Sequence, residues 1–134
     1  MATSQSTIDF LIDQLVTLSD VKYRKMFGEY ALYCDGKVVA LVCDDELFIK
    51  PTNQGLFVIS IRLFDEDVHN FEKLSEDKKC LFLEKTKKRI ENPPYPNAKM
   101  WFLISGDLLD DREWLCELVK ETANALPYPK MKKS

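Results

Sequence analysis

YALYCDGKVVALVCDDELFIK, residues 30–50, consists of three short apolar segments separated by two polar turns. The first turn, Asp35-Gly36, is the strongest short signal for a β-hairpin, because both positions tolerate a positive φ. Asp44-Asp45 forms a second tight turn, and Pro51 ends the third segment because proline has no backbone N–H to donate. The stretch therefore predicts a three-stranded antiparallel meander over residues 30–34, 37–43 and 46–50.

The first turn also sets a register for the hairpin. It pairs Cys34 with Lys37, and an unbroken ladder then places Cys43 opposite Gly28. On this register the thiols of Cys34 and Cys43 do not face each other.

Helical patterns flank the meander on both sides. Apolar residues recur at helical spacing before it and predict a helix that begins near Ser6 and ends near residue 19 or 20. After it, residues 52–66 are rich in β-formers, but they follow a strand and the capping pair Thr52-Asn53, so we favour a helix. Residues 67–90 are more clearly helical, and Ser75 opens their second part.

The C-terminal third contains one strand and one helix. Residues 99–104 are continuously apolar and predict a buried strand. A final helix begins near residue 110 or 111 and is ended by Pro127. We expect residues 127–134, which include three lysines, to form a flexible basic tail.

This order predicts an α+β fold for residues 1–134 as a single domain. Its two layers are an antiparallel sheet, made of the three-stranded meander plus the later strand, and the N- and C-terminal helices that pack on it. A helical insert occupies residues from about 57 to 91. The length of 134 residues fits one domain.

Composition excludes several classes of protein. Hydrophobic residues make up 46% and charged residues 31%, which is ordinary globular composition. No apolar run approaches the ~20 residues that span a bilayer, and residues 1–5 do not resemble a signal peptide. We therefore expect a cytoplasmic protein with no membrane contact.

Neither a metal site nor a catalytic motif can be recognised. The four cysteines are scattered and His69 is the single histidine, so we expect reduced thiols and no metal or other cofactor. No nucleophile elbow, phosphate-binding glycine loop or dinucleotide fingerprint occurs. We do not expect an enzyme, although a site assembled from distant residues remains an alternative.

The segment MFGEY, residues 26–30, contains the first candidate site. One interpretation is a binding loop formed by Met26, Phe27, Gly28 and Tyr30, with an exposed aromatic side chain. The other, which we favour, is that Met26 and Phe27 plug the core while Gly28 supplies a turn or bulge.

Two basic segments form a candidate patch. Lys22, Arg24 and Lys25 alternate with an aromatic residue, which is a pattern that suits phosphate and base contacts. The second segment supplies four more basic residues, Lys85, Lys87, Lys88 and Arg89. The favoured interpretations are a solvated loop for the first and a mixed-charge exposed helix for the second. The net charge of −3 also does not favour nucleic-acid binding.

The tripeptide Pro-Tyr-Pro occurs twice, around Tyr95 and around Tyr128. Such segments can dock in aromatic grooves, or they can be stiff loops whose tyrosine packs on the domain. The sequence does not decide between these two interpretations.

Three separated blocks resemble the N-terminal domain of TfoX/Sxy-type proteins. They are VKYRKMFGEYALYCDG at residues 21–36, PPYPNAKMWFLI at residues 93–104, and LDDREWL at residues 109–115, which runs on to LPYPK at residues 126–130. The family pattern in the first block is an arginine-rich approach, Met-Phe-Gly, an aromatic-rich strand and Asp-Gly. This chain differs at Glu29 and Ala31, where the family commonly has small residues or glycine.

The resemblance implies a regulatory or interaction module that binds a protein partner. Regulators of this family are implicated in natural transformation, acting with the cyclic-AMP receptor protein at promoters, and the family offers no catalytic residues to carry over. We expect a stand-alone domain, because residue 134 comes where these regulators continue into a helical C-terminal domain. The alternatives are direct nucleic-acid binding through the basic patch, or a small-molecule or enzymatic pocket between sheet and helices.

Overall fold

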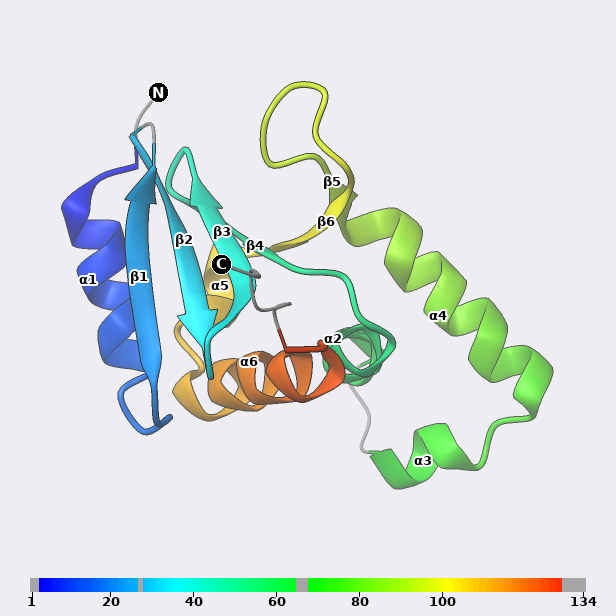
Figure 1. The fold of residues 1–134 in the computed structure, drawn as a ribbon. Helices are drawn as coiled ribbons and strands as arrows, with labels where there is room; N and C mark the ends of the chain where they lie inside the picture. The colour runs from blue at the N-terminus through cyan, green and yellow to red at the C-terminus, as the bar shows by residue number, and fades with distance from the viewer. Residues whose placement is uncertain (1–2, 27, 65–67, 129–134) are drawn as a thin grey trace.

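The structure is a computed structural model that describes residues 3–26, 28–64 and 68–128 (Figure 1). Its helices are α1 (Gln5–Gln14), α2 (Asn53–Phe64), α3 (Val68–Glu72), α4 (Glu76–Ile90), α5 (Gly106–Leu109) and α6 (Arg112–Ala125). Its strands are β1 (Val21–Met26), β2 (Glu29–Cys34), β3 (Lys37–Cys43), β4 (Glu46–Ile49), β5 (Glu91–Asn92) and β6 (Trp101–Ile104). All strand pairs are antiparallel and the order is β1-β2-β3-β4-β6-β5. The predicted α+β class is therefore confirmed.

The described sheet has six strands, two more than the sequence analysis expected. Lys22, Arg24 and Lys25, which were interpreted as part of a solvated loop, lie in the edge strand β1, which pairs with β2 along its whole length. Five of its six residues are exposed, so the strand lacks the apolar alternation that reveals a half-buried strand. The other addition, β5, has two residues and pairs with β6 at the opposite edge.

The two predicted turns of the meander are confirmed. Asp35 and Gly36 have φ of 55° and 77°, and Asp44 and Asp45 have φ of 53° and 62°. Positive φ at both central residues matches the right-handed twist of the flanking strands.

The predicted register of the first hairpin holds for the two residue pairs next to the turn and is wrong beyond them. Cys34 pairs with Lys37 as expected, but Leu32 pairs with Ala40 because a bulge lies between Leu32 and Tyr33. The bulge shifts the ladder by one residue. Since Tyr30 pairs with Val42, the next residue of β3, Cys43, lies on the level of Glu29 and not of Gly28. The thiols of Cys34 and Cys43 remain apart, and both are free.

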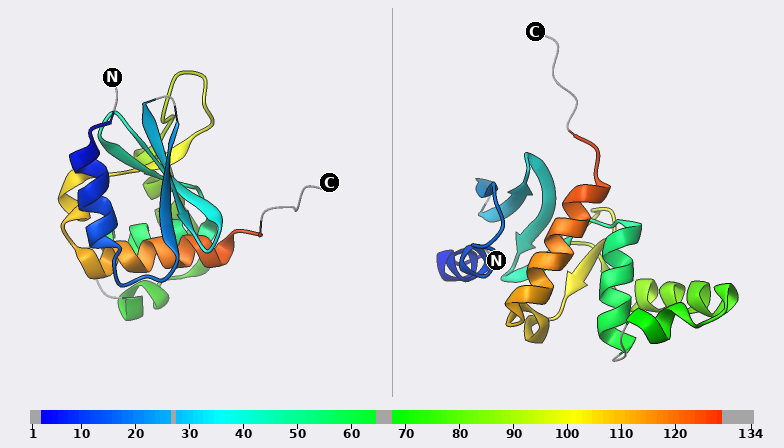
Figure 2. Two further views of the ribbon diagram at one scale, coloured as in Figure 1. Left: turned by 60° about the vertical axis from the view of Figure 1, so that its left-hand side comes forward. Right: turned by 90° about the horizontal axis from the view of Figure 1, so that it is seen from below.

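One face of the sheet carries the main core. Helices α1, α2 and α6 lie on this side of the sheet (Figure 2), and buried side chains of β2, β3, β4 and β6 form one apolar cluster with theirs. The fully buried side chains include Ile8 from α1, Leu32 from β2, Ile49 from β4, Ile59 from α2 and Leu115 from α6. The sheet-and-helix layering was predicted because helical and strand periods are readable along the chain.

The predicted insert is helical and has its own apolar contacts. Residues 53–64 form helix α2, as favoured, and Ser75 caps α4 by accepting a hydrogen bond of 3.3 Å from the Lys78 N–H. Four phenylalanines from α2, α3 and α4 meet edge to face, with ring centroids 4.7 to 6.4 Å apart. These are Phe57, Phe64, Phe71 and Phe82. Figure 1 shows that α4 extends away from the sheet at the β5 edge, far from β1.

Helix ends also follow local chemistry. Asp111 caps α6 by accepting the Trp114 N–H, whereas Ser4 at the start of α1 makes no such side-chain cap. Asp45 in the β3–β4 turn instead connects the start of α1 to the sheet, because its Oδ1 accepts both the Ser4 N–H and the Thr7 hydroxyl at 2.8 Å. Within the described ranges, no helix is long and apolar enough to cross a membrane.

Candidate functional site

The face of the sheet opposite the core, called the outer face below, has a continuous row of paired residues. Arg24 pairs with Ala31, Ala31 with Leu41, Leu41 with Phe48, and Phe48 with Leu103. Directly paired residues point to the same face, so this row crosses from β1 to β6. Leu41 and Leu103 remain half-buried. The outer face is therefore largely apolar and becomes basic at the β1 edge.

A cavity of about 390 Å³ opens at one end of this face. It is lined by Met26, Glu29, Tyr30, Leu41, Cys43 and Tyr95. Most of this lining is apolar, and the volume falls within the ~300–1,000 Å³ typical of ligand-sized clefts. The cavity brings together two segments that were predicted separately, the candidate binding loop and the first Pro-Tyr-Pro loop.

Three of the predicted site residues occupy different positions in this cavity. Met26 and Tyr95 are 42% and 57% exposed, so the interpretation that Met26 plugs the core is wrong. Tyr30 is buried, and its hydroxyl donates to Gln5 Oε1 at 3.1 Å. Gly28 has a φ of 82°, as a turn glycine requires. Phe27 lies outside the described residues.

The polar groups of the cavity are held by hydrogen bonds or burial. Glu29 Oε2 accepts from the Thr3 hydroxyl at 2.5 Å and from the Asp44 N–H at 2.9 Å. Burial, aided by the neighbouring Glu29 carboxylate, raises the pKa of Cys43 to about 11. The thiol is thus protonated at neutral pH and lacks the reactivity of a catalytic cysteine. The wall that the cavity offers to a bound group is therefore mostly apolar, and its polar groups are held in place.

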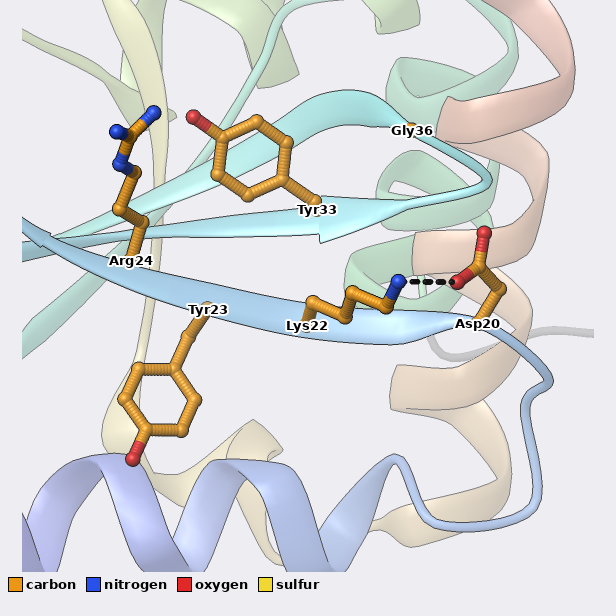
Figure 3. A pocket seen from close by; sticks show the side chains of 6 residues that line it. All are labelled: Asp20, Lys22, Tyr23, Arg24, Tyr33 and Gly36. Atoms are coloured by element: carbon orange, nitrogen blue, oxygen red, sulfur yellow. Dashed lines mark ion pairs between the residues drawn. The ribbon is translucent and has the colours of Figure 1, made fainter.

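A second hollow of about 300 Å³ lies further along β1 (Figure 3). Its lining includes Lys22, Arg24 and Tyr33, and Arg24 and Tyr33 point to the same side of the sheet while Tyr23 points toward α1. Lys22 forms an exposed ion pair with Asp20, with 3.5 Å between Nζ and Oδ1. Two residues of the predicted basic patch, Lys22 and Arg24, therefore lie on a strand and line one hollow, and are not part of a loop.

The remaining predicted residues do not join these hollows. Lys85, Lys87, Lys88 and Arg89 belong to α4, which lies beyond the opposite edge of the sheet (Figure 1). Lys87 lines a separate cavity of about 260 Å³ that also contacts Cys80 and Phe102. Tyr128 is 74% exposed and packs its ring 4.2 Å from Lys37 Nζ, at the end of β3 far from Cys43. Tyr95 and Tyr128 therefore do not form one docking site.

Sequence reasoning missed Leu41 and Cys43 as site residues. A signal was present, because β3 is apolar at consecutive positions and not only at alternate ones. A strand that is apolar on both faces is typical of a sheet whose two faces are both covered.

No described group points to metal chemistry. In the parts of the chain that the structure describes, no three His, Cys, Asp or Glu side chains are grouped so that they could hold a metal ion. His69 lies in α3, away from both hollows of the outer face.

Comparison with known proteins gives three matches. The model of the TfoX N-terminal domain matches residues 13–59. An uncharacterised 12.7 kDa protein in the trpE 5′ region of Spirochaeta aurantia is 32% identical over 138 residues, covering 100% of this chain and 92% of that protein. Protein Sxy of Escherichia coli (strain K12) is 40% identical over 43 residues, covering 32% of this chain and 21% of Sxy. The residues of this chain that match Sxy thus correspond to about a fifth of that protein.

Proposed function

Since the chain belongs to the TfoX N-terminal domain family, we propose that it is a regulatory domain that acts by binding a protein partner through the outer face of its sheet. The observation that carries the proposal is the convergence of Met26 and Tyr95 on one apolar cavity. These two side chains come from distant parts of the sequence and are both substantially exposed. The family match includes β1–β4, which supply most of the cavity wall.

The size and lining of the cavity support a protein partner. Binding sites between proteins are centred on a few buried anchors, and methionine and tyrosine are enriched there. An apolar side chain of the partner that enters the cavity would bury Met26 and Tyr95 together. The resemblance to the Sxy regulators favours a regulatory role for such binding, and competence is the process to which that resemblance points.

A two-stage experiment tests the proposal. A photo-cross-linking amino acid is placed at position 26, and in a parallel strain at position 81, which is an exposed leucine on α4. A protein that is cross-linked from position 26 and not from position 81 is then purified, and its Kd for the domain is measured directly.

Matched substitutions decide the outcome. We expect Met26→Asp to weaken the purified complex by about tenfold or more, as loss of an interface anchor does. Leu81→Asp, an equally drastic change at an exposed apolar residue elsewhere, should leave Kd unchanged. The proposal fails if no protein is cross-linked specifically from position 26, or if both substitutions have the same effect on Kd.

Direct nucleic-acid binding is a second candidate, favoured by the hollow that combines Lys22, Arg24 and Tyr33. Cations supply phosphate contacts, and an aromatic ring can stack on a base. It predicts that a single-stranded oligonucleotide binds with an affinity that falls steeply with salt concentration. Absence of binding at low salt, or binding that Arg24→Glu does not weaken, would remove this candidate.

A further inference from the structure

Strand β1 is a long free edge of the sheet. The strand order begins with β1, whose neighbour is β2. In an antiparallel pair, alternate residues turn their N–H and C=O groups away from the partner strand. Among the described residues, none from outside the sheet makes a backbone hydrogen bond to residues 21–26. The edge can therefore accept another strand, whereas β5 at the other edge has two residues.

This edge is strongly basic. Lys22, Arg24 and Lys25 supply three cations within six residues, and all three are exposed. Lys22 is partly neutralised by Asp20. In the described part of the chain, Arg24 and Lys25 have no ion-pair partner. A segment that lies along β1 would place the Cβ atoms of its directly paired residues about 5 Å from the Cβ atoms of these basic residues.

The last residue of β1 on the outer face, Met26, is apolar. Lys22, Arg24 and Met26 alternate along the strand and so point to one face. The first two line the basic hollow and Met26 lines the 390 Å³ cavity. The two hollows thus follow each other along one strand edge.

We propose that the partner binds by adding a β-strand to the β1 edge, and that the added strand is acidic. On its outer-face side it places acidic residues beside Lys22 and Arg24 and a large apolar residue beside Met26, at the mouth of the cavity. This inference rests on the proposed function and specifies the partner's chemistry. Main-chain hydrogen bonds supply the binding mode, and the alternate side chains supply specificity.

The charges argue against a second copy of this chain as the occupant. Pairing two β1 strands would bring six lysine and arginine side chains together along one ladder. Like charges in opposing positions destabilise a sheet, and edge lysines are a known device against such pairing. The acidic segment of another protein neutralises the same charges.

Two synthetic peptides test the inference. In one, acidic residues alternate with valine and are followed by leucine; the other has the reverse order, because the added strand can run in either direction. Fluorescence anisotropy measures their binding to the full chain. We expect one peptide to bind better than its sequence-scrambled control, and Arg24→Glu to weaken it by about tenfold. Lys85→Glu on α4 is the matched charge control and should have no effect.

Backbone N-methylation separates strand addition from charge attraction. Methyl groups on the amides of the peptide edge that faces β1 should abolish binding, whereas methyl groups on the opposite edge should not. Equal effects of the two methylation patterns, or no binding of either peptide, would overturn the inference. Dimerisation of the free protein, detected by sedimentation together with cross-linking between two copies from position 26, would also overturn it, because it would make a second copy the occupant.

Different outcomes would contradict partner binding at the outer face and the addition of an acidic strand at β1. A partner whose complex is weakened by Met26→Asp, but which is indifferent to Arg24→Glu, leaves the proposed function standing and removes the inference that an acidic strand is added at β1. A partner that is indifferent to both substitutions removes the proposed function itself.

Discussion

The ammonium group of Lys37, the first residue of β3, donates a hydrogen bond of 2.8 Å to the carbonyl oxygen of Ala123 in the last turn of α6. Lys37 is only 8% exposed, and its Nζ also lies 4.2 Å from the centroid of the Tyr128 ring. A cation at a helix C-terminus interacts favourably with the helix dipole, and here it shares the Ala123 carbonyl with the Leu126 N–H, which lies 3.2 Å from it. The pair therefore connects the β2–β3 hairpin to the end of α6.

We predict that Lys37→Met destabilises the fold. Methionine preserves most of the aliphatic length but leaves the Ala123 carbonyl without its charged donor. Loss of a charge-assisted hydrogen bond of this kind costs about 1.5–3 kcal/mol. Urea unfolding followed by circular dichroism measures the change. Lys120→Met on the exposed side of α6 is the control, and equal losses for the two variants would contradict the assignment.

We predict that Gly55→Ala is destabilising although alanine is the better helix former. A Cβ atom at Gly55 would lie 2.9 Å from Thr52 Oγ1 and 3.1 Å from Thr122 Oγ1, where α2 passes close to α6. Overpacking at such a contact costs up to about 3 kcal/mol, which is more than the ~1 kcal/mol gained in helix propensity. Gly106→Ala is the matched control, since nothing lies within 4 Å of its Cβ position. Thermal unfolding should show a lower Tm for the first variant and an unchanged or higher Tm for the second.

We predict that the four thiols react at very different rates in the folded protein. Cys80 is exposed on α4, whereas the other three cysteines are buried. With a pKa of about 11 for Cys43, roughly 0.1% of that thiol is ionised at about pH 8. Brief treatment with iodoacetamide followed by peptide mapping should label Cys80 first, and Cys80→Ser should remove the fast phase. Labelling of Cys43 as fast as Cys80 would mean that the cavity wall opens readily.

Sequence alone predicted the elements that depend on local signals. Asp35-Gly36 and Asp44-Asp45 fixed both turns of the meander, because positive φ is a property of a few residue types. Strand β1 was missed because an edge strand needs little burial, and three of its residues are cations. The bulge next to Leu32 was also unreadable, since a single extra residue leaves no compositional trace.

The candidate site was predictable as parts and not as a whole. Met26 and Tyr95 were each selected from their own segments, but their meeting at one cavity depends on the path of residues 93–100 over the sheet. Similarly, Arg24 and the α4 lysines look alike in sequence, and only the strand order separates them to opposite edges. Contacts between distant segments follow from packing, which a linear pattern does not encode.

We predict that the stabilising effect of Asp111 depends on pH. A hydrogen bond from the Arg62 guanidinium, assisted by the Trp114 N–H, lowers the pKa of Asp111 from its ordinary value of 3.8. A carboxyl group whose pKa is lower in the folded state stabilises the fold above its unfolded-state pKa, and this contribution disappears as the pH falls through the folded-state pKa. Because the Asp111 side chain is 36% exposed, screening limits the ion-pair contribution to about 0.5–1 kcal/mol.

Asp111→Asn isolates this contribution, because asparagine is also a good N-cap and keeps the bond to Trp114. The free energy of unfolding should be lower than in the wild type at about pH 7, and the difference should shrink as the pH falls through the folded-state pKa of Asp111, below which both proteins carry a neutral side chain at this position. Asp110→Asn, next to it but exposed and outside the ion pair, is the control and should show little difference at either pH. A deficit for Asp111→Asn that stays constant between the two pH values would mean that shape, and not charge, is what Arg62 recognises at the start of α6.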